Sequence, residues 1–311
     1  MQIALLILQQ MIQFFLMVFM GYLLVKTGLR TPGDSKTLSI VTVYLVLPCV
    51  VINAFQIEYT PETAQGLLLA AGAALTAQIL FLIVIAVCGK IFGLNQVEKA
   101  SIMYPNAGNL TLPIVLSVLG PEWVVYSSVF VAIQQIFIWT HGKALLCGEK
   151  GVEWKKILTN VNILSILAGI ALFLLRFQLP EIITQTMNSF SALLAPVSMV
   201  IIGMLAAGRS LGRTFCDRRI YLTAAIRLVL CPLLTMALTL LTGVHRLLPD
   251  GDTILFITLL ACAGPAAATV TQQAQVYGAD AEYAGAVNVV TTALCLVTMP
   301  VMAGLYWVLI G

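Results

Sequence analysis

The sequence has few charged residues. Asp, Glu, Lys and Arg make up only 9% of its 311 residues, whereas 60% are hydrophobic and the mean hydropathy is +1.01. A soluble domain carries about 25% charged residues, so the composition excludes a water-soluble fold of this length. The net charge of +3 is not concentrated in a basic domain, and we expect no nucleic acid as a partner.

The sequence also lacks the residue patterns of common enzymes and metal sites. Its two histidines and seven cysteines form no CxxC pair and no Cys/His cluster, and HExxH is absent. No pair of aspartates lies inside an apolar run. We therefore expect no enzyme, no cofactor and no resident metal, and we interpret the cysteines as small packing residues.

Long apolar runs are what the sequence has instead. A helix needs about 20 apolar residues to cross the hydrocarbon core, and continuous rather than alternating runs indicate helices instead of a barrel. The pattern predicts an all-α membrane protein with the lipid bilayer as its surroundings. We predict ten transmembrane helices, at 4–25, 38–56, 64–89, 98–119, 122–146, 160–178, 186–207, 219–243, 253–277 and 283–309.

The distribution of Lys and Arg predicts the orientation. Thirteen of the 16 basic residues lie in or beside the loops that follow the first, third, fifth and seventh predicted helices, and only Arg176 and Arg246 lie in loops on the other side. Basic loops face the cytoplasm. We therefore expect a multi-pass inner-membrane protein with both termini on the periplasmic side.

The chain divides into two halves with matching features. Pro48 and Pro196 are 148 residues apart, as are Gly21 and Gly169. A repeat of five helices must insert its second copy upside down, because the number is odd. We predict two inverted repeats, residues 1–146 and 160–311, joined by a cytoplasmic linker at 147–159.

The fourth and ninth predicted helices, which are the fourth helix of each half, are both interrupted by proline and glycine. The interruptions lie in the stretches 104–120 and 261–278. Such a break frees backbone N–H groups from one half-helix and carbonyls from the other. The amino end of a half-helix carries partial positive charge and suits a carboxylate, and paired broken helices are typical of transport sites. A single kink would indicate packing, whereas two matched breaks favour a binding site.

Neutral polar residues surround the two predicted breaks. All 13 acidic residues lie in loops or at helix ends, which argues against a carboxylate-based antiporter and suits an anionic substrate. The predicted binding residues are Asn106, Asn109, Thr111, Pro113, Pro265, Gln272 and Gln273, with Asn53, Gln134, Gln135, Arg227 and Asn288 as supporting candidates. Each glutamine has the alternative of hydrogen bonding between helices, and coupling to Na⁺ or H⁺ stays open.

Arg227 is the one basic residue inside a predicted span. We expect its side chain to snorkel to the cytoplasmic interface; the alternative is an electropositive group near an inward-facing vestibule. Because an unperturbed histidine changes its charge close to physiological pH, His141, at the cytoplasmic end of the fifth predicted helix, could couple transport to protons. An interfacial histidine without a role is the simpler interpretation.

The run Pro105-Asn106-Ala107-Gly108-Asn109-Leu110-Thr111-Leu112-Pro113 resembles the fourth-helix signature of the auxin efflux carrier family. The run Gly264-Pro265-Ala266, followed by Ala274, Tyr277-Gly278 and Asp280, resembles the ninth-helix signature, and Thr298-Met299-Pro300 continues the likeness. The resemblance covers essentially the whole chain and fits the bacterial branch.

The resemblance implies that the two broken helices cross and that a small organic anion, a mono- or dicarboxylate, sits beside the crossing. Asn106 matches the position whose amide contacts the substrate carboxylate, and Pro113 and Pro265 match the crossover prolines. The first, second, sixth and seventh helices would form a scaffold that dimerises. The others would form a transport domain that moves as an elevator. Where plant members have an acid/base pair, the third predicted helix offers Thr76 and Gln78.

Two alternatives remain open from the sequence. A sodium-coupled organic-anion symporter of the bile-acid type would share this architecture, and sodium dependence of uptake would distinguish it. A channel or sensor would share it as well, and saturable flux would separate a carrier from both.

Overall fold

A computed structural model describes residues 2–56, 60–147, 159, 161–208 and 216–310. In these ranges the regular structure is helical, apart from one isolated antiparallel bridge between Pro105 and Ala266. The prediction of an all-α protein is confirmed for the described part of the chain. Each of the ten predicted ranges contains helix, while the predicted linker at 147–159 lies mostly outside the described residues.

The helices follow one another with short connections in both halves. The first half contains α1 (Gln2–Lys26), η1 (Pro32–Asp34), α2 (Ser35–Val41), η2 (Thr42–Val46), α3 (Leu47–Ala54), α4 (Pro61–Phe92), α5 (Gln96–Met103), η3 (Ala107–Thr111), α6 (Leu112–Val118), η4 (Pro121–Trp123), α7 (Val124–Phe137), η5 (Ile138–Gly142) and α8 (Lys143–Cys147). The second half contains α10 (Val161–Leu174), α11 (Glu181–Ser191), α12 (Leu194–Ala207), α14 (Arg218–Ala225), η6 (Ile226–Leu230), α15 (Cys231–Thr242), η7 (Val244–Leu247), α16 (Gly251–Cys262), α17 (Ala268–Tyr277) and α18 (Ala281–Leu309).

Several of these helices are long and apolar enough to cross a membrane. Six described segments qualify, at Pro32–Ala54, Pro61–Phe92, Pro121–Leu146, Glu181–Ala207, Arg218–Thr242 and Ala281–Leu309. Four shorter apolar helices accompany them, at Ile12–Lys26, Ala107–Val118, Ile163–Leu174 and Gly251–Cys262. The structure is therefore that of a multi-pass membrane protein.

Local sequence signals set the ends of the helices beside the breaks. Thr60 caps α4 by accepting a hydrogen bond from the Thr63 N–H, and Gly93 ends that helix at φ 61°. Asn95 and Glu98 form a capping box that starts α5. Asp280 caps α18 through the Tyr283 N–H.

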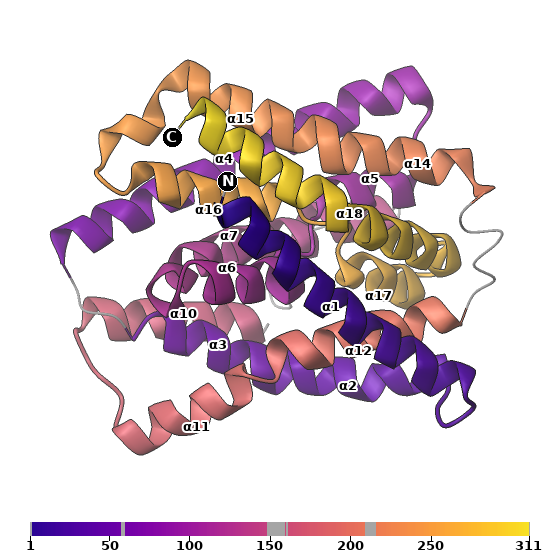
Figure 1. Ribbon diagram of the computed structural model, residues 1–311, viewed down its shortest axis with the longest axis horizontal. Coiled ribbons are helices and arrows are strands. Elements are labelled where there is room, and N and C mark those ends of the chain that lie inside the picture. The colour runs from indigo at the N-terminus through magenta and orange to yellow at the C-terminus, as the bar shows by residue number, and fades with distance from the viewer. Residues whose placement is uncertain (1, 57–59, 148–158, 160, 209–215, 311) are drawn as a thin grey trace.

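The helices form two groups, and α1 and α18 run diagonally in front of them (Figure 1). In that view α2, α3, α10, α11 and α12 lie in the lower part, α4, α14, α15 and α16 lie in the upper part, and α6, α7 and α17 lie between. The backbones of α1 and α12 approach closely at two glycines. A Cβ on Gly203 would lie 1.9 Å from the Val18 carbonyl oxygen, and one on Gly21 would lie 2.2 Å from that of Val200.

Three helices widen into a π-helical turn shortly before a proline. The turns η2, η3 and η6 end two residues before Pro48, Pro113 and Pro232 respectively. A proline offers no N–H to the carbonyl four residues back, and its ring clashes with that carbonyl. The wider turn moves the carbonyl away, so the helix can continue past its proline.

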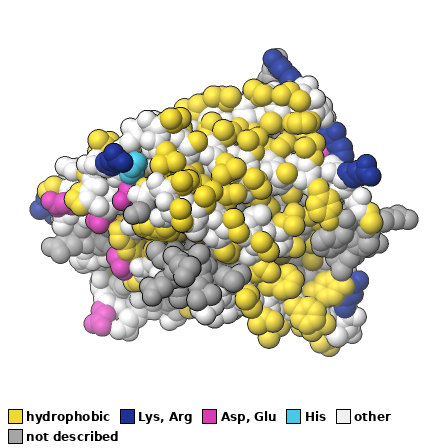
Figure 2. Space-filling model, turned by 45° about the horizontal axis from the view of Figure 1, so that its top comes forward, with side chains coloured by type: hydrophobic (Ala, Val, Ile, Leu, Met, Phe, Trp, Pro, Cys, Tyr) yellow, Lys and Arg dark blue, Asp and Glu magenta, His cyan; other side chains and the backbone are white. Residues whose placement is uncertain are grey.

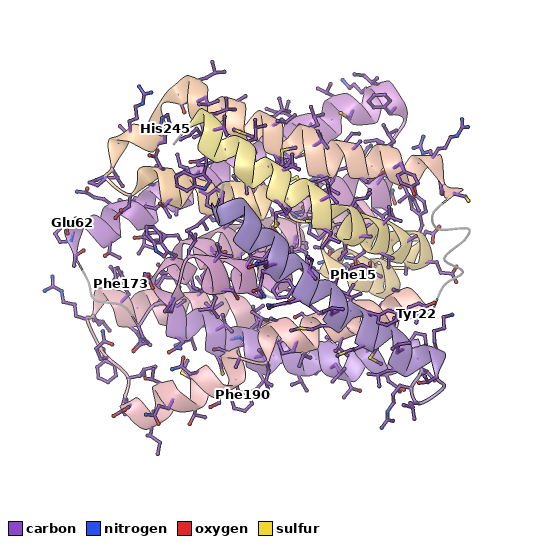
Figure 3. The ribbon with its side chains drawn as sticks, in the orientation of Figure 1. Phe15, Tyr22, Glu62, Phe173, Phe190 and His245 are labelled. Atoms are coloured by element: carbon purple, nitrogen blue, oxygen red, sulfur yellow. The ribbon has the colours of Figure 1, made fainter. Side chains whose placement is uncertain are left out.

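The surface separates into an apolar middle and charged ends. Figure 2 shows hydrophobic side chains over the broad middle, Lys and Arg gathered mainly at one end, and Asp and Glu mainly at the other. Glu62 and His245 lie toward the acidic end and Tyr22 toward the basic end (Figure 3). Large apolar side chains such as Leu241 and Val308 are more than four-fifths exposed on the outside, as lipid-facing side chains are.

Candidate functional site: the crossing of two broken helices

The two broken helices meet through their extended backbone. After α5 the chain leaves helical geometry at Tyr104 (φ −111°, ψ 104°), and before α17 Ala267 is extended (φ −66°, ψ 135°). The Asn106 N–H donates to the Pro265 carbonyl at 2.8 Å, and the Ala267 N–H donates to the Tyr104 carbonyl at 2.9 Å. These two bonds form the antiparallel bridge, so the segments 104–106 and 265–267 cross in contact.

The crossing prolines are Pro105 and Pro265. Pro105 is itself a bridge residue, whereas Pro113 lies in the first turn of α6. The assignment of Pro113 as a crossing proline was therefore wrong. Pro113 instead accounts for the π-helical turn η3. Its ring would clash with the carbonyl four residues back, which belongs to Asn109 inside that turn.

The helix that follows each break donates a side-chain amide to the crossing. Gln134 of α7 donates to the Pro105 carbonyl at 2.8 Å, and Asn288 of α18 donates to the Ala266 carbonyl at 2.6 Å. Thr291 accepts the Ala266 N–H at 3.1 Å. These bonds satisfy backbone groups that the breaks leave without helical partners.

Arg227 lies at the crossing and does not snorkel. Its side chain is fully buried and donates from Nε to the Gly264 carbonyl at 3.0 Å, from one terminal nitrogen to Ile102 at 2.7 Å and from the other to Cys262 at 2.5 Å. The snorkelling expectation was therefore wrong. Sequence position placed the residue two turns inside the helix, but the carbonyls that hold it there come from two other helices.

Several buried polar atoms near the crossing have no hydrogen-bond partner in the described part of the chain. They are Asn106 Nδ2, Thr111 Oγ1, Gln134 Oε1 and Gln273 Oε1. Asn106 is 3% exposed and Thr111 is fully buried. Buried polar atoms are usually paired, so an unpaired donor beside a helix amino end marks a place for an acceptor.

The remaining predicted residues have other positions. Asn53 donates to Asn188 and so joins α3 to α11. Asn109 and Gln135 are half-buried and form no hydrogen bond with another described side chain. Gln273 reaches the Ile138 carbonyl at 3.4 Å. The backbone of Gln272 belongs to α17, but its side chain is outside the described part.

His141 contacts the first crossing segment. Its Nδ1 lies 2.9 Å from the Tyr104 hydroxyl, which also donates to the Phe137 carbonyl at 3.0 Å. The histidine is thus part of the packing around the crossing and not a free interfacial group.

No group of three His, Cys, Asp or Glu side chains that would hold a metal occurs among the described residues.

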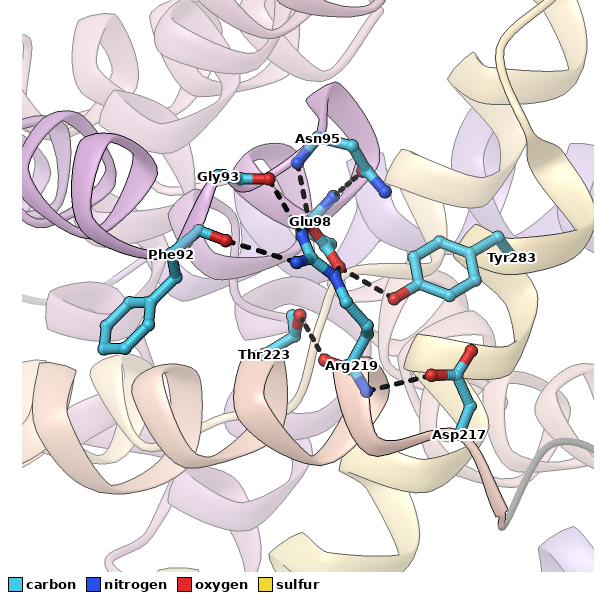
Figure 4. Close-up of polar contacts among 8 residues, drawn as sticks. All are labelled: Phe92, Gly93, Asn95, Glu98, Asp217, Arg219, Thr223 and Tyr283. Atoms are coloured by element: carbon cyan, nitrogen blue, oxygen red, sulfur yellow. Dashed lines mark hydrogen bonds and ion pairs between the residues drawn. The ribbon is translucent and has the colours of Figure 1, made fainter.

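The sequence did not predict an ion pair at the start of α5. Glu98 is fully buried and accepts two hydrogen bonds from Arg219, at 2.8 and 2.6 Å, and one from the Tyr283 hydroxyl at 2.9 Å (Figure 4). Arg219 also donates to the Phe92 and Gly93 carbonyls. The cluster joins α4, α5, α14 and α18. The Asn95–Glu98 spacing is a local signal for the start of α5, but no local signal pairs Glu98 with Arg219.

Comparison with known proteins agrees with this architecture. The family described as membrane transport protein matches residues 6–153 and 148–303. A protein of Rhizobium meliloti (strain 1021) named "Putative malonate transporter" is 26% identical over 306 residues, covering 92% of this chain and 91% of its own. Both matches indicate a transporter and not an enzyme. The chain therefore belongs to the membrane transport protein family, the auxin efflux carrier family whose paired motifs its sequence carries.

Proposed function

We propose that this protein is a secondary transporter that carries a small organic anion, with dicarboxylates of the malonate type as the first candidates. The observation that carries the proposal is Asn106 Nδ2, a buried amide donor without a partner among the described residues, at the amino end of the half-helix Ala107–Val118. A carboxylate there would accept from this amide and meet the positive end of the half-helix. The name of the similar Rhizobium protein makes malonate the obvious probe.

The proposed mechanism is elevator-type alternating access. The helices α4–α8 and α14–α18 would move together as a transport domain, and α1–α3 with α10–α12 would form the scaffold and the interface of a homodimer. The cluster of Glu98, Arg219 and Tyr283 supports this division, because its hydrogen bonds join only helices of the proposed transport domain.

Matching contacts in the two halves support the proposed inverted repeat. The side-chain amide of Gln134 caps one crossing segment from the helix after the first break, as Asn288 does after the second. Gly21 of α1 packs on α12 of the other half, and Gly169 of α10 packs on Phe55 at the end of α3. Each half thus places its first helix against the second helix of the other.

The test is uptake of radiolabelled malonate into proteoliposomes, with acetate, succinate and benzoate as further probes. Sodium gradient, proton gradient and membrane potential are varied independently. Saturable uptake that unlabelled malonate inhibits is the expected result, and the gradient that drives it names the coupling. Flux that rises linearly with concentration would instead indicate a channel, and no uptake by folded, inserted protein would overturn the proposal.

A further inference from the structure

Arg227 is a buried cation that is held only by backbone carbonyls in the described part of the chain. Its three acceptors are Ile102, Cys262 and Gly264. Its guanidinium also lies over the Phe81 ring, 5.0 Å from the ring centroid. A buried arginine is ordinarily paired with a carboxylate, so this arrangement needs another source of negative charge.

The carboxyl ends of two half-helices supply that charge. Ile102 belongs to the last turn of α5, and Cys262 is the last residue of α16. Each helix end carries about half a negative charge, so two ends together offset about one positive charge. Arg227 therefore neutralises the two negative ends that meet at the crossing.

Without this neutralisation an anion would meet unfavourable charge. The positive amino ends of Ala107–Val118 and α17 and the negative carboxyl ends of α5 and α16 all converge on the segments 104–106 and 265–267. An anion bound beside Asn106 would be attracted by the amino ends and repelled by the carboxyl ends. The buried guanidinium offsets the negative charge of the carboxyl ends, so the attraction by the amino ends remains.

Carbonyls freed by a broken helix are also the ligands with which coupled carriers hold sodium. Here three of them are bound by a side chain whose charge is permanent, because arginine stays protonated in proteins. Five N–H donors in a rigid fork allow one guanidinium to reach carbonyls from two helices. The π-helical turn η6 contains Arg227 at its second position, and such turns often occur at functional sites.

We propose that Arg227 is a built-in counter-cation: it holds the carboxyl ends of α5 and α16 together, and it makes anion binding at the crossing independent of sodium. The second half of this statement rests on the proposed anion transport. Arg227 acts as a positioning residue through the backbone of the crossing and not by contact with the substrate.

The test compares wild type with Arg227→Lys, Arg227→Met and the control Arg218→Met, which removes an exposed arginine nine residues earlier. Thermal unfolding is measured in sodium chloride and in choline chloride, and malonate uptake is measured with and without sodium. We expect neither wild-type value to depend on sodium. We expect Arg227→Met to lower Tm, because its charged hydrogen bonds to the crossing are lost. We also expect it to raise KM for malonate about ten-fold or more, because the negative helix ends are then no longer offset. Sodium should restore part of its Tm.

Arg227→Lys should raise KM for malonate less than Arg227→Met does, since it keeps the charge but loses the fork. Sodium-dependent stability or uptake in wild type would overturn the proposal, and so would an unchanged KM in Arg227→Met. If Arg227→Met fails to fold, the wild-type sodium comparison and the KM of Arg227→Lys decide. Wild type could transport no malonate and still have a Tm that is independent of sodium and falls in Arg227→Met. That result would contradict the proposed anion transport but support the role of Arg227 in holding the two helix ends together.

Discussion

Asn106 uses its backbone and its side chain for different tasks. Its N–H is bound to the Pro265 carbonyl, which fixes the side chain at the crossing. Its Nδ2 is buried and unpaired in the described part of the chain. A side chain that is held in place but left without a partner is suited to bind something that comes and goes.

The first prediction concerns this amide. Asn106→Ala removes the donor and leaves the backbone bond, so we expect the protein to fold while KM for malonate rises at least several-fold, as loss of a hydrogen bond to a charged group does. Asn109→Ala is the comparison, because Asn109, another predicted binding residue, lies three positions further on in η3 and is only half-buried. Equal effects of the two variants on uptake kinetics would contradict the assignment.

The second prediction concerns the amides that cap the crossing. Gln134→Leu and Asn288→Leu each leave a buried carbonyl unpaired, and we expect each to destabilise the fold by about 1–2 kcal/mol. Gln135→Leu should be near neutral, since Gln135 is half-buried and forms no hydrogen bond among the described residues. Chemical unfolding in mixed micelles measures the difference, and a Gln135 variant as unstable as the Gln134 variant would argue against capping.

At the scale of the elements, prolines near the crossing have two separate roles. Pro105 lies in the extended bridge, whereas Pro113 lies in the first turn of α6, directly after the π-helical turn η3. The sequence showed two prolines eight residues apart but not which of them lay in the break, because both disrupt a helix locally.

The third prediction separates these roles. Pro105→Ala permits α5 to extend through the break, so we expect it to abolish most malonate uptake. Pro113→Ala permits η3 to become a regular α-helix, which turns Asn106 and Asn109 relative to α6 and should reduce uptake more weakly. Malonate uptake is measured for both variants at equal expression. Normal transport by Pro105→Ala would mean that the backbone hydrogen bonds of the bridge are sufficient to keep the helix broken without the proline.

The fourth prediction concerns the contact between α1 and α12. A Cβ at position 203 would overlap the Val18 carbonyl oxygen, so Gly203→Ala should force the helices apart and lower Tm. Gly72→Ala is the control, because a Cβ there meets nothing within 4 Å and alanine is the better helix former by about 1 kcal/mol. We expect Gly72→Ala to leave Tm unchanged or raise it; a fall as large as that of Gly203→Ala would point to a general intolerance of the fold.

At the scale of the whole molecule, the charges at the two ends predict the orientation in the membrane. The fifth prediction uses Cys216, an exposed free cysteine two residues before α14. In a Cys147→Ser background, an impermeant maleimide should label Cys216 in inside-out vesicles and not in right-side-out ones, because basic loops stay in the cytoplasm. Labelling from the periplasmic side would reverse the proposed topology, and Cys216→Ser controls for reaction elsewhere.

The sequence by itself determined the class of the protein and the positions of its helices. Apolar runs long enough to cross a bilayer leave the backbone no other way to satisfy its hydrogen bonds, so composition and run length were sufficient. Paired Pro and Gly signals also located both breaks, because those residues act on the backbone within a turn of where they stand.

Only the tertiary structure decided which groups meet at the breaks. The partners of Arg227 are 35 to 37 residues away at Cys262 and Gly264 and 125 residues away at Ile102, and the partner of Glu98 is 121 residues away. No local pattern encodes such pairs, because a charged side chain near a helix end has the same sequence signature whether it reaches water or a buried carbonyl. Burial and the direction of neighbouring helix ends set its partner, and both arise only when the helices pack.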